Sequence, residues 1–435
     1  MNIRFPLVIV GSQWGDEGKG KVVDLLAAQA KHIVRYNGGN NAGHSVVLNG
    51  EKFKLSLLPS GILHKKKLYL SHGVAVNPKV LLEEIEFFEK RGIKLSLMID
   101  PRCHIVMPYH RELDRATELW KGKKATGSLH LGIGYTYEDK NNRVGARFED
   151  LINPEQLKEK LKMYFPIKKA IIEKVFGQKT NLTVDKIYKE YVGYGRRLKK
   201  YLGDVSRTIS DASRHGSKNK ILFEGAHGTF LDGIFGTYPY TTAVYTIAGG
   251  VFPYVGIPPQ KIYSMGIVKA YTTRVGNGPF PTELENPTGQ KIREKGGEFG
   301  TVSKRPRRCG WLDLCLVRTA ARLSGFDYLA ITKLDVLSVV DRIKICTHYV
   351  IPSEARNPAK RKRIIKEVPS LIADFYRCKP IYKEFKGWKK DISAVRRFED
   401  LPKEAKIYVK FIEQQLKVPV KLVSVGAERQ SNIFL

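Results

Sequence analysis

The sequence has no long apolar run and few cysteines. It contains no stretch of about eighteen apolar residues, which excludes an ordinary membrane-spanning helix, and its first residues show no signal-peptide pattern. The five cysteines are odd in number and show no Cys-x-x-Cys spacing, so neither a disulfide framework nor a zinc site is indicated. These absences predict a cytoplasmic protein with reduced, mostly buried thiols.

Negative charge is also scarce. The 43 acidic residues stand against 75 lysines and arginines, for a net charge of +32, and such an excess is typical of nucleic-acid binders. The basic residues are spread along the chain, however, and form no recognised nucleic-acid module. We therefore expect weak, salt-sensitive nucleic-acid binding at most, with no specific recognition. Anionic substrates are a second, sufficient use for the positive potential.

Short apolar runs alternate with helical patterns, as in a doubly wound sheet. We expect strands at 7–10, 32–36, 68–70, 97–99, 105–107, 221–223, 262–268, 328–332, 344–349 and 420–425, and a helix at 78–90. Residues 150–215 read as a helical excursion without strands, and residues 353–418 as a charged helical segment. The fold class predicted is α/β, a single domain over residues 1–435 with a large, mostly parallel central sheet, a P-loop-like nucleotide site and helical excursions.

A glycine-rich loop, Gly11 to Lys21, follows the first strand, and Val22, Leu25, Leu26 and Ile33 recur behind it at helical spacing. Four glycines let the backbone turn its N–H groups toward an anion, and the helix N-terminus and two lysines add positive charge. Val22 stands where a serine or threonine would normally contact magnesium. Another oxygen must then hold the metal, and Asp16 is the nearest candidate.

Further motifs accompany this loop in order: Asn37–Ser45, Phe223–Thr229, Lys269–Gly276, Arg305–Trp311 and Thr332–Asp335. With them the chain resembles the adenylosuccinate synthetase family from its first strand to its last residues. The resemblance implies a homodimer that ligates L-aspartate to IMP with GTP. The reaction passes through 6-phosphoryl-IMP and gives adenylosuccinate, GDP and phosphate.

The resemblance maps two catalytic residues. Asp16 is the general base that removes the N1 proton of IMP, so that O6 can attack the γ-phosphate of GTP. His44, on a second glycine turn, would as an imidazolium neutralise charge on the transferred phosphoryl group. Mg²⁺ is expected on Asp16, the Gly43 carbonyl and phosphate oxygens, because this ion prefers hard oxygen ligands.

A guanine reader is predicted where Lys333 and Asp335 follow an apolar strand. A carboxylate there can accept hydrogen bonds from N1–H and the 2-amino group of guanine, which adenine does not offer, while a lysine stem covers the ring. The nucleotide expected is therefore GTP. The full set of GTP-binding residues expected is Gly15, Asp16, Glu17, Gly18, Lys19, Gly20, Lys21, Gly43, His44, Ser45, Arg307, Lys333, Leu334, Asp335, Ser424, Val425 and Gly426.

The other two substrates are assigned by resemblance. The IMP-binding residues expected are Asp16, Lys19, Asn41, His44, Ser128, Arg143, His227, Thr242 and Arg305, with Arg143 reaching in from the neighbouring subunit. The residues expected to bind L-aspartate are Val275, Val302, Ser303, Arg305 and Arg307. Arginine suits the latter role because its guanidinium fork matches a carboxylate bidentately.

Three places depart from the family pattern, all around the nucleoside monophosphate. Residues 125–134 replace the usual Thr-Thr-Gly-Arg, so that either Ser128 or Thr126 supplies the hydroxyl for the IMP phosphate. His227 replaces a glutamine, and we expect its charge to vary with pH. Residues 243–245 read Ala-Val-Tyr in place of a more polar Ser-Ser-Asn. Two alternatives therefore stay open: ligation of aspartate to a 2-amino purine monophosphate such as dGMP, and a non-catalytic GTP-binding, RNA-associated protein.

Overall fold

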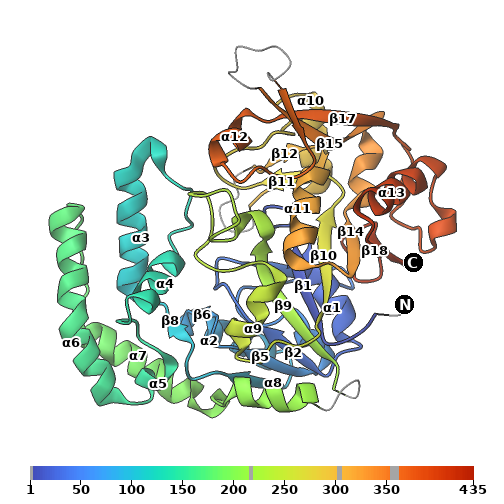
Figure 1. The fold of residues 1–435 in the computed structure, drawn as a ribbon. Helices are drawn as coiled ribbons and strands as arrows, with labels where there is room; N and C mark the ends of the chain where they lie inside the picture. The colour runs from blue at the N-terminus through green and yellow to red at the C-terminus, as the bar shows by residue number, and fades with distance from the viewer. Residues whose placement is uncertain (1–2, 215–218, 301–305, 353–361) are drawn as a thin grey trace.

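The computed structural model describes residues 3–214, 219–300, 306–352 and 362–435, and a nine-stranded sheet runs through its centre (Figure 1). Neighbouring strands are parallel throughout except for the last pair, β18 and β19, which is antiparallel. The strands, in spatial order, are β19 (Asn432–Phe434), β18 (Val420–Ser424), β14 (Tyr328–Thr332), β10 (Tyr263–Lys269), β1 (Leu7–Gly11), β9 (Ile221–Gly228), β2 (His32–Arg35), β5 (Lys67–Leu70) and β7 (Ser96–Ile99). The predicted fold class is confirmed.

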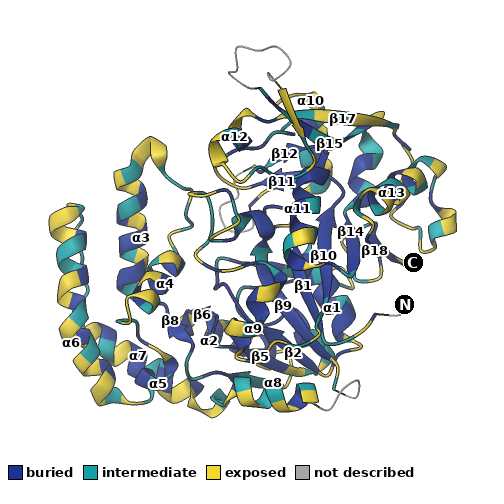
Figure 2. Ribbon diagram, in the orientation of Figure 1, coloured by how far each residue is buried: buried dark blue, intermediate teal, exposed yellow. Residues whose placement is uncertain are grey.

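Both faces of the sheet are covered by apolar side chains, and the inner strands β1, β2 and β14 are buried along their length, whereas the edge strand β7 is mostly half-buried or exposed (Figure 2). Along β1, Leu7 and Ile9 enter one hydrophobic cluster, while Val8 and Val10 enter the other, because successive side chains point to opposite faces. Helices α1 (Lys19–Ala27) and α2 (Pro78–Glu89) pack in the first cluster. Helices α11 (Leu314–Ser324) and α13 (Lys403–Leu416) pack in the second.

The predicted helical excursion lies to one side of the sheet (Figure 1). Within the described residues 150–214 the chain forms helices and no named strand, as expected. Two helices, α3 and α4, precede this stretch in the chain and follow the last of the N-terminal strands. The helices of this side are α3 (Pro108–Lys121), α4 (Ile133–Asn141), α5 (Phe148–Leu151), α6 (Pro154–Ala170) and α7 (Val184–Leu198), whereas the last helix of the stretch, α8 (Val205–Arg214), packs beneath the sheet near β2 and β5 (Figure 1).

Two expectations about secondary structure were wrong, and a third strand was predicted correctly but lies in another sheet. Ile33 lies in β2 and not in the helix behind the loop. Of residues 105–107 the strand β8 takes in only Ile105, together with His104, and it pairs with β6 (Ala75–Val76) outside the central sheet. The predicted strand at 344–349 is part of β15 (Arg342–Pro352), which belongs to a second sheet.

The second sheet also corrects the expectation for the charged segment at 353–418. Its described part holds helices α12 (Ile372–Arg377) and α13, but also strands β16 (Lys362–Ile365) and β17 (Lys379–Lys386), both antiparallel to β15; residues 353–361 lie outside the described structure. The fourth strand of this second sheet is β13 (Leu312–Asp313). Exposed residues, mainly lysine and glutamate, alternate with half-buried residues along β17. These charged residues hid the strand in the sequence pattern, because they are uncommon in strands.

Shorter elements frame the carboxyl edge of the central sheet. A hairpin joins β3 (His44–Leu48) to β4 (Glu51–Leu55), β11 (Thr272–Arg274) pairs with β12 (Arg308–Gly310), and α9 and α10 span Val251–Val255 and Pro287–Gly296. The five cysteines are free and buried, as expected. Across the part of the chain that is described, no helix has the length and hydropathy needed to cross a membrane.

Candidate active site

The glycine-rich loop connects β1 to α1, and its shape depends on a buried carboxylate. Asp16, Gly15 and Gly18 all have positive φ values, of 58°, 85° and 88°. The backbone N–H groups of Gln13 and Gly15 each donate to Glu17 Oε1 at 3.0 Å, and Lys19 Nζ donates to Oε2 at 2.7 Å. Glu17 is fully buried, so its side chain holds the loop from the inside.

Two glycines make room for this carboxylate at the ends of neighbouring strands. A Cβ atom on Gly11 of β1 would lie 2.3 Å from Glu17 Oε2, and one on Gly228 of β9 would lie 2.5 Å from Oε1. Both distances are far below van der Waals contact. Any larger residue at either strand end would therefore displace the carboxylate that shapes the loop.

The second lysine of the loop turns away from it. Lys21 Nζ donates to Ser424 Oγ at 2.7 Å, to the Gly426 carbonyl at 2.6 Å and to the Ser431 carbonyl at 3.0 Å. Burial lowers the pKa of Lys21 to about 8. The predicted GTP residues Lys21, Ser424, Val425 and Gly426 thus lie together, with the ammonium fixing the C-terminal segment beside the loop.

His44 packs against the first turn of α1. A Cβ atom on Gly20 would lie 2.9 Å from His44 Cβ, which places the imidazole at the helix N-terminus. Its Nδ1 contacts Glu224 Oε1 closely and lies 3.1 Å from Ser60 Oγ. Glu224 also accepts from the Ser60 N–H at 2.8 Å and from Ser60 Oγ at 2.6 Å. The carboxylate fixes the orientation of the ring.

The charges of this pair depend on burial. Burial lowers the pKa of His44, and Glu224 opposes that shift. Burial also disfavours the charge of Glu224, but His44 and the nearby Arg35 outweigh it and lower the pKa of Glu224. An arriving phosphoryl group would add the negative charge that favours the imidazolium. The role of Glu224 was not predicted from the sequence, although a charged residue directly after the apolar run 221–223 could have indicated it.

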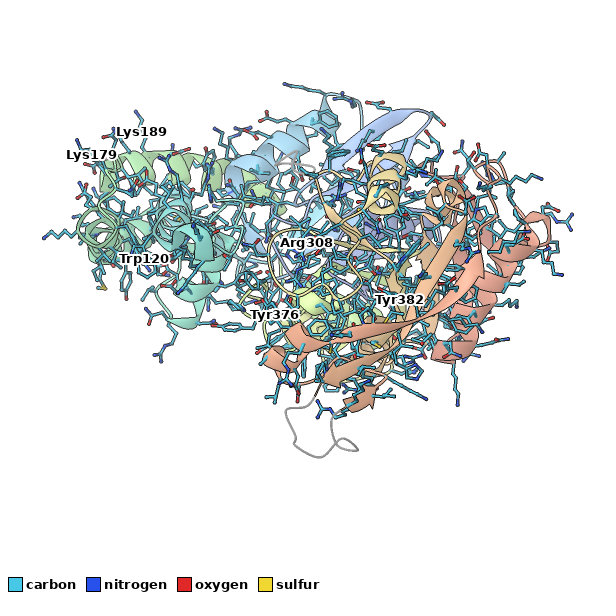
Figure 3. All side chains as sticks on the ribbon, turned by 90° about the horizontal axis from the view of Figure 1, so that it is seen from above. Trp120, Lys179, Lys189, Arg308, Tyr376 and Tyr382 are labelled. Atoms are coloured by element: carbon cyan, nitrogen blue, oxygen red, sulfur yellow. The ribbon has the colours of Figure 1, made fainter. Side chains whose placement is uncertain are left out.

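Asp16 meets a residue expected at the aspartate site. Asp16 Oδ2 lies 2.8 Å from Arg307 Nε, and Arg307 Nη1 donates to Glu298 Oε2 at 2.7 Å. In the view of Figure 3, the next residue, Arg308, lies between Trp120 of α3 and Lys189 of α7 on one side and Tyr382 of β17 on the other. The expected residues Val302, Ser303 and Arg305 lie outside the described residues.

A cavity of about 940 Å³ brings together four of the nine residues predicted for IMP, together with Val275 from the set predicted for L-aspartate, whereas Asp16, Lys19 and His44 do not line it. Its lining includes Asn41, Ser128, His227, Thr242 and Val275. Asn41 Oδ1 and His227 Nε2 are buried and have no hydrogen-bond partner among the described residues, as expected for groups that await a ligand.

Arg143 is exposed just beyond α4 and does not line this cavity. Its φ of 63° places it in the left-handed region, and its backbone N–H donates to the Lys140 carbonyl at 3.1 Å. Nothing in the geometry of one chain therefore directs its guanidinium into the chain's own cavity.

The departure at residues 125–134 forms a turn around Glu118 of α3. The N–H groups of Thr126, Gly127 and Ser128 donate to its carboxylate at 2.8–3.1 Å, and Thr126 Oγ1 donates at 2.7 Å. Although burial opposes it, these donors lower the pKa of Glu118 to about 2. Since the Thr126 hydroxyl is engaged, Ser128 is the better placed of the two candidates; its Oγ accepts from the His130 N–H at 3.2 Å.

His227 does not titrate as expected. Burial, assisted by Lys19, Arg35 and His44, lowers its pKa to about 3. The imidazole therefore stays neutral at every pH at which the protein would be assayed. The expectation of a pH-dependent charge was wrong because it assumed an ordinary histidine pKa.

The predicted guanine reader lies beside the loop. Thr332 Oγ1, at the end of β14, donates to the Glu17 carbonyl at 2.5 Å. Asp335 Oδ1 is buried without a hydrogen-bond partner among the described residues, and burial raises the pKa of Asp335. Lys333 Nζ donates to Glu298 Oε1 at 2.7 Å and to the Gly296 carbonyl at 2.8 Å. A buried, unpartnered carboxylate oxygen is suited to accept from guanine.

One further group of potential metal ligands occurs among the described residues: Asp313, Cys315 and Cys346, all fully buried. Their polar atoms are already engaged within the fold. Asp313 accepts from the Cys315 N–H at 3.0 Å, which caps α11, and from the Tyr349 hydroxyl. This cluster stabilises the start of α11 and lies apart from the loop residues.

Comparisons with known proteins find one family along almost the whole chain. The family model described as adenylosuccinate synthetase matches residues 8–433. The chain is 48% identical over 432 residues to the adenylosuccinate synthetase of Desulforamulus reducens, covering 99% of this chain and 98% of that protein. It is 46% identical over 434 residues to that of Geobacter metallireducens, with 99% and 98% covered.

Solved structures are similar too. The fully ligated adenylosuccinate synthetase from Plasmodium falciparum matches with a TM-score of 0.91 at 36% identity, covering 99% of each chain. A cyanophage S-2L succinoaminodeoxyadenylate synthetase, bound to dGMP and dATP, matches with a TM-score of 0.59 at 18% identity, covering 98% of this chain and 94% of that one. The second likeness shows the fold alone.

Glu224→Gln is expected to lower kcat by about 10²–10⁴-fold while GTP binding persists, because the amide no longer favours the imidazolium of His44. Steady-state rates and nucleotide titrations measure this. Glu84→Gln is the matched control, since Glu84 is a half-buried carboxylate near Arg35 but accepts from backbone N–H groups at 56–58 and does not contact His44. Equal losses in both variants would contradict the positioning role.

His227→Gln is expected to leave the shape of the activity–pH profile unchanged. In acid, its free energy of unfolding should rise relative to that of the wild type. The unfolded histidine binds a proton as pH falls below about 6.5, whereas the folded one, with a pKa of about 3, does not. At about pH 5 the variant should thus gain about 2 kcal/mol relative to its position at neutral pH. Denaturant unfolding of both proteins at several pH values checks this; a constant difference would contradict the lowered pKa.

Proposed function

The chain belongs to the adenylosuccinate synthetase family, and we propose that the residues brought together at its carboxyl sheet edge ligate L-aspartate to IMP. The enzyme is a GTP-dependent ligase. The observation that carries the assignment of residues is the contact of Asp16 with Arg307, which places a candidate base of the first step beside a candidate aspartate ligand of the second.

In the first step Asp16 takes the N1 proton of IMP. O6 then forms a bond to the γ-phosphorus of GTP as the bond to the β–γ bridging oxygen breaks and GDP leaves. His44, oriented by Glu224, neutralises charge on the moving phosphoryl group. The loop held by Glu17 and the lysine Lys19 position the phosphates.

In the second step the amine of L-aspartate forms a bond to C6 and phosphate leaves. Arg307, with Arg305, receives the carboxylates of L-aspartate; Asp16 must release Arg307 Nε before that edge of the guanidinium is free. At the other end of GTP, the unpartnered oxygen of Asp335 accepts from guanine. The cavity beside His227, Asn41 and Thr242 receives IMP.

The residues present fit Mg²⁺. Asp16 is partly exposed, with 35% of its side chain accessible, and the Gly43 carbonyl lies on an exposed turn, so both offer hard oxygen ligands next to the phosphate loop. We propose that these two groups and phosphate oxygens hold the ion. When bound, it would neutralise charge on the phosphate oxygens.

Assembly and location are also proposals. A homodimer in which Arg143 completes the partner's IMP site is supported by its exposure outside its own cavity. One domain over residues 1–435 is supported by a buried cluster that runs from Val8 to Ile433. Five free, buried thiols fit the reducing cytoplasm.

The alternatives are not favoured. The likeness to the dGMP-bound cyanophage enzyme extends to the fold alone, whereas relatives at 45–48% identity carry the name adenylosuccinate synthetase. A protein that only bound GTP and RNA would have no use for Asp16 next to Arg307.

Asp16→Ala is expected to abolish adenylosuccinate formation while GTP binding persists, because Lys19 and the loop amides remain. Loss of a general base costs about 10²–10⁴ in rate. Product formation from IMP, GTP and L-aspartate, followed chromatographically, measures this. Asp204→Ala, an exposed carboxylate of the helical excursion, is the control and should keep full activity. Retention of more than a tenth of the wild-type rate would remove Asp16 from the base role.

Mixing Asp16→Ala protein with Arg143→Leu protein is expected to restore activity after subunit exchange. In a mixed dimer, the chain that keeps Asp16 receives Arg143 from its partner, so one of two equivalent sites is whole. Random pairing makes about half of the dimers mixed, and roughly a quarter of the wild-type rate should return. No recovery after demonstrated exchange would mean that each site is built within one chain.

A further inference from the structure

Glu298 is a fully buried carboxylate shared by three cations. Its Oε1 accepts from Lys269 Nζ at 3.0 Å, from Lys333 Nζ at 2.7 Å and from the Tyr271 hydroxyl at 2.5 Å. Its Oε2 accepts from Arg307 Nη1 at 2.7 Å. Oε1 thus accepts from three donors and Oε2 from one. Neither the sequence motifs nor the proposed reaction assigns Glu298 a role.

The partners of Glu298 belong to two substrate sites. Lys333 precedes Asp335 by two residues and is proposed to cover the guanine ring. Arg307 contacts Asp16 and is proposed to bind L-aspartate. One carboxylate thus joins the group that meets the base of GTP to the group that meets the amino acid.

The backbone of Glu298 fixes Arg307 as well. The Arg307 N–H donates to the Glu298 carbonyl at 2.9 Å, and Phe299 forms a β-bridge with Pro306. Side chain and main chain therefore hold the same residue at two points. This arrangement fixes where the guanidinium lies.

The positive charges around Glu298 make its carboxylate necessary. Without it, Lys269, Lys333 and Arg307 would repel one another at a site where water is scarce, because Lys269 is fully buried and Arg307 is 8% exposed. Burial disfavours the charge of Glu298, yet its three cations outweigh that effect and lower the pKa of Glu298. The lysines and the arginine can stay together only around an anion.

We propose that Glu298 is a positioning residue that holds Arg307 for the carboxylates of L-aspartate and Lys333 for the guanine nucleotide. The inference rests on the proposed roles of Arg307 and Lys333. Glu298 does not line the cavity assigned to IMP, so we expect the KM for IMP to be the least affected of the three.

Glu298→Gln tests this by separating the three substrates. The amide keeps the shape but removes the charge, so the KM values for GTP and L-aspartate should each rise by at least about tenfold, whereas the KM for IMP stays within about twofold. Glu298→Asp keeps the charge and should recover part of both losses. Asp150→Asn is the matched control: Asp150 is a buried carboxylate paired with Lys160 at 2.7 Å, within the helical excursion, and its loss should leave all three KM values unchanged.

Calorimetric titration with GDP gives a readout that does not need turnover. Binding should weaken by at least about tenfold in Glu298→Gln and remain unchanged in Asp150→Asn. Unchanged GDP and L-aspartate parameters, or an equal rise in all three KM values, would overturn the proposal. If Glu298→Gln does not fold, the same comparison in Glu298→Asp decides it, with smaller shifts in the same two substrates. Failure of the wild-type protein to form adenylosuccinate would instead overturn the proposed function, and the GDP titration would still test the contact with Lys333.

Discussion

Repulsion between the positively charged groups of the site is the constraint on which the rest of this structure depends. The site collects lysines, arginines and backbone N–H groups for substrates that are all negatively charged. Three buried carboxylates hold these groups in place. Glu17 binds Lys19 and two loop amides, and Glu224 binds His44. Glu298 binds Lys269, Lys333 and Arg307. Each pair loses solvation on burial, so each persists because its geometry supplies several hydrogen bonds at once.

The same constraint explains how the two steps of the reaction share one site. Asp16 contacts Arg307, so with the roles proposed above it must leave Arg307 when it turns to the N1 proton of IMP. The guanidinium edge that Asp16 contacts is then free for a carboxylate of L-aspartate. The large positive charge of the chain fits this use, since its substrates bring several negative charges to one place.

The sequence predicted the elements whose signal is local. The loop from Gly11 to Lys21, the buried parallel strands and the helical excursion follow from residue patterns over short windows. Of the three carboxylates that hold the site it named Glu17, whose partners are local, but not Glu224 or Glu298, whose partners are more distant in the sequence: Glu224 is 180 residues from His44. Strand β17 was missed because its charged outer face masks its pattern, and the neutral state of His227 was missed because burial cannot be read from a motif. The turn around Glu118 explains why Thr126 is engaged, which no local pattern indicated.

The central claim is that this chain activates IMP by moving the γ-phosphoryl group of GTP to its O6 atom before L-aspartate attacks. IMP labelled with heavy oxygen at O6 tests this directly when it is converted with GTP and L-aspartate, and the phosphate released is analysed by mass spectrometry. The account predicts that the phosphate carries the label in proportion to the adenylosuccinate formed. Unlabelled phosphate, with adenylosuccinate still formed in equal amount, would contradict it.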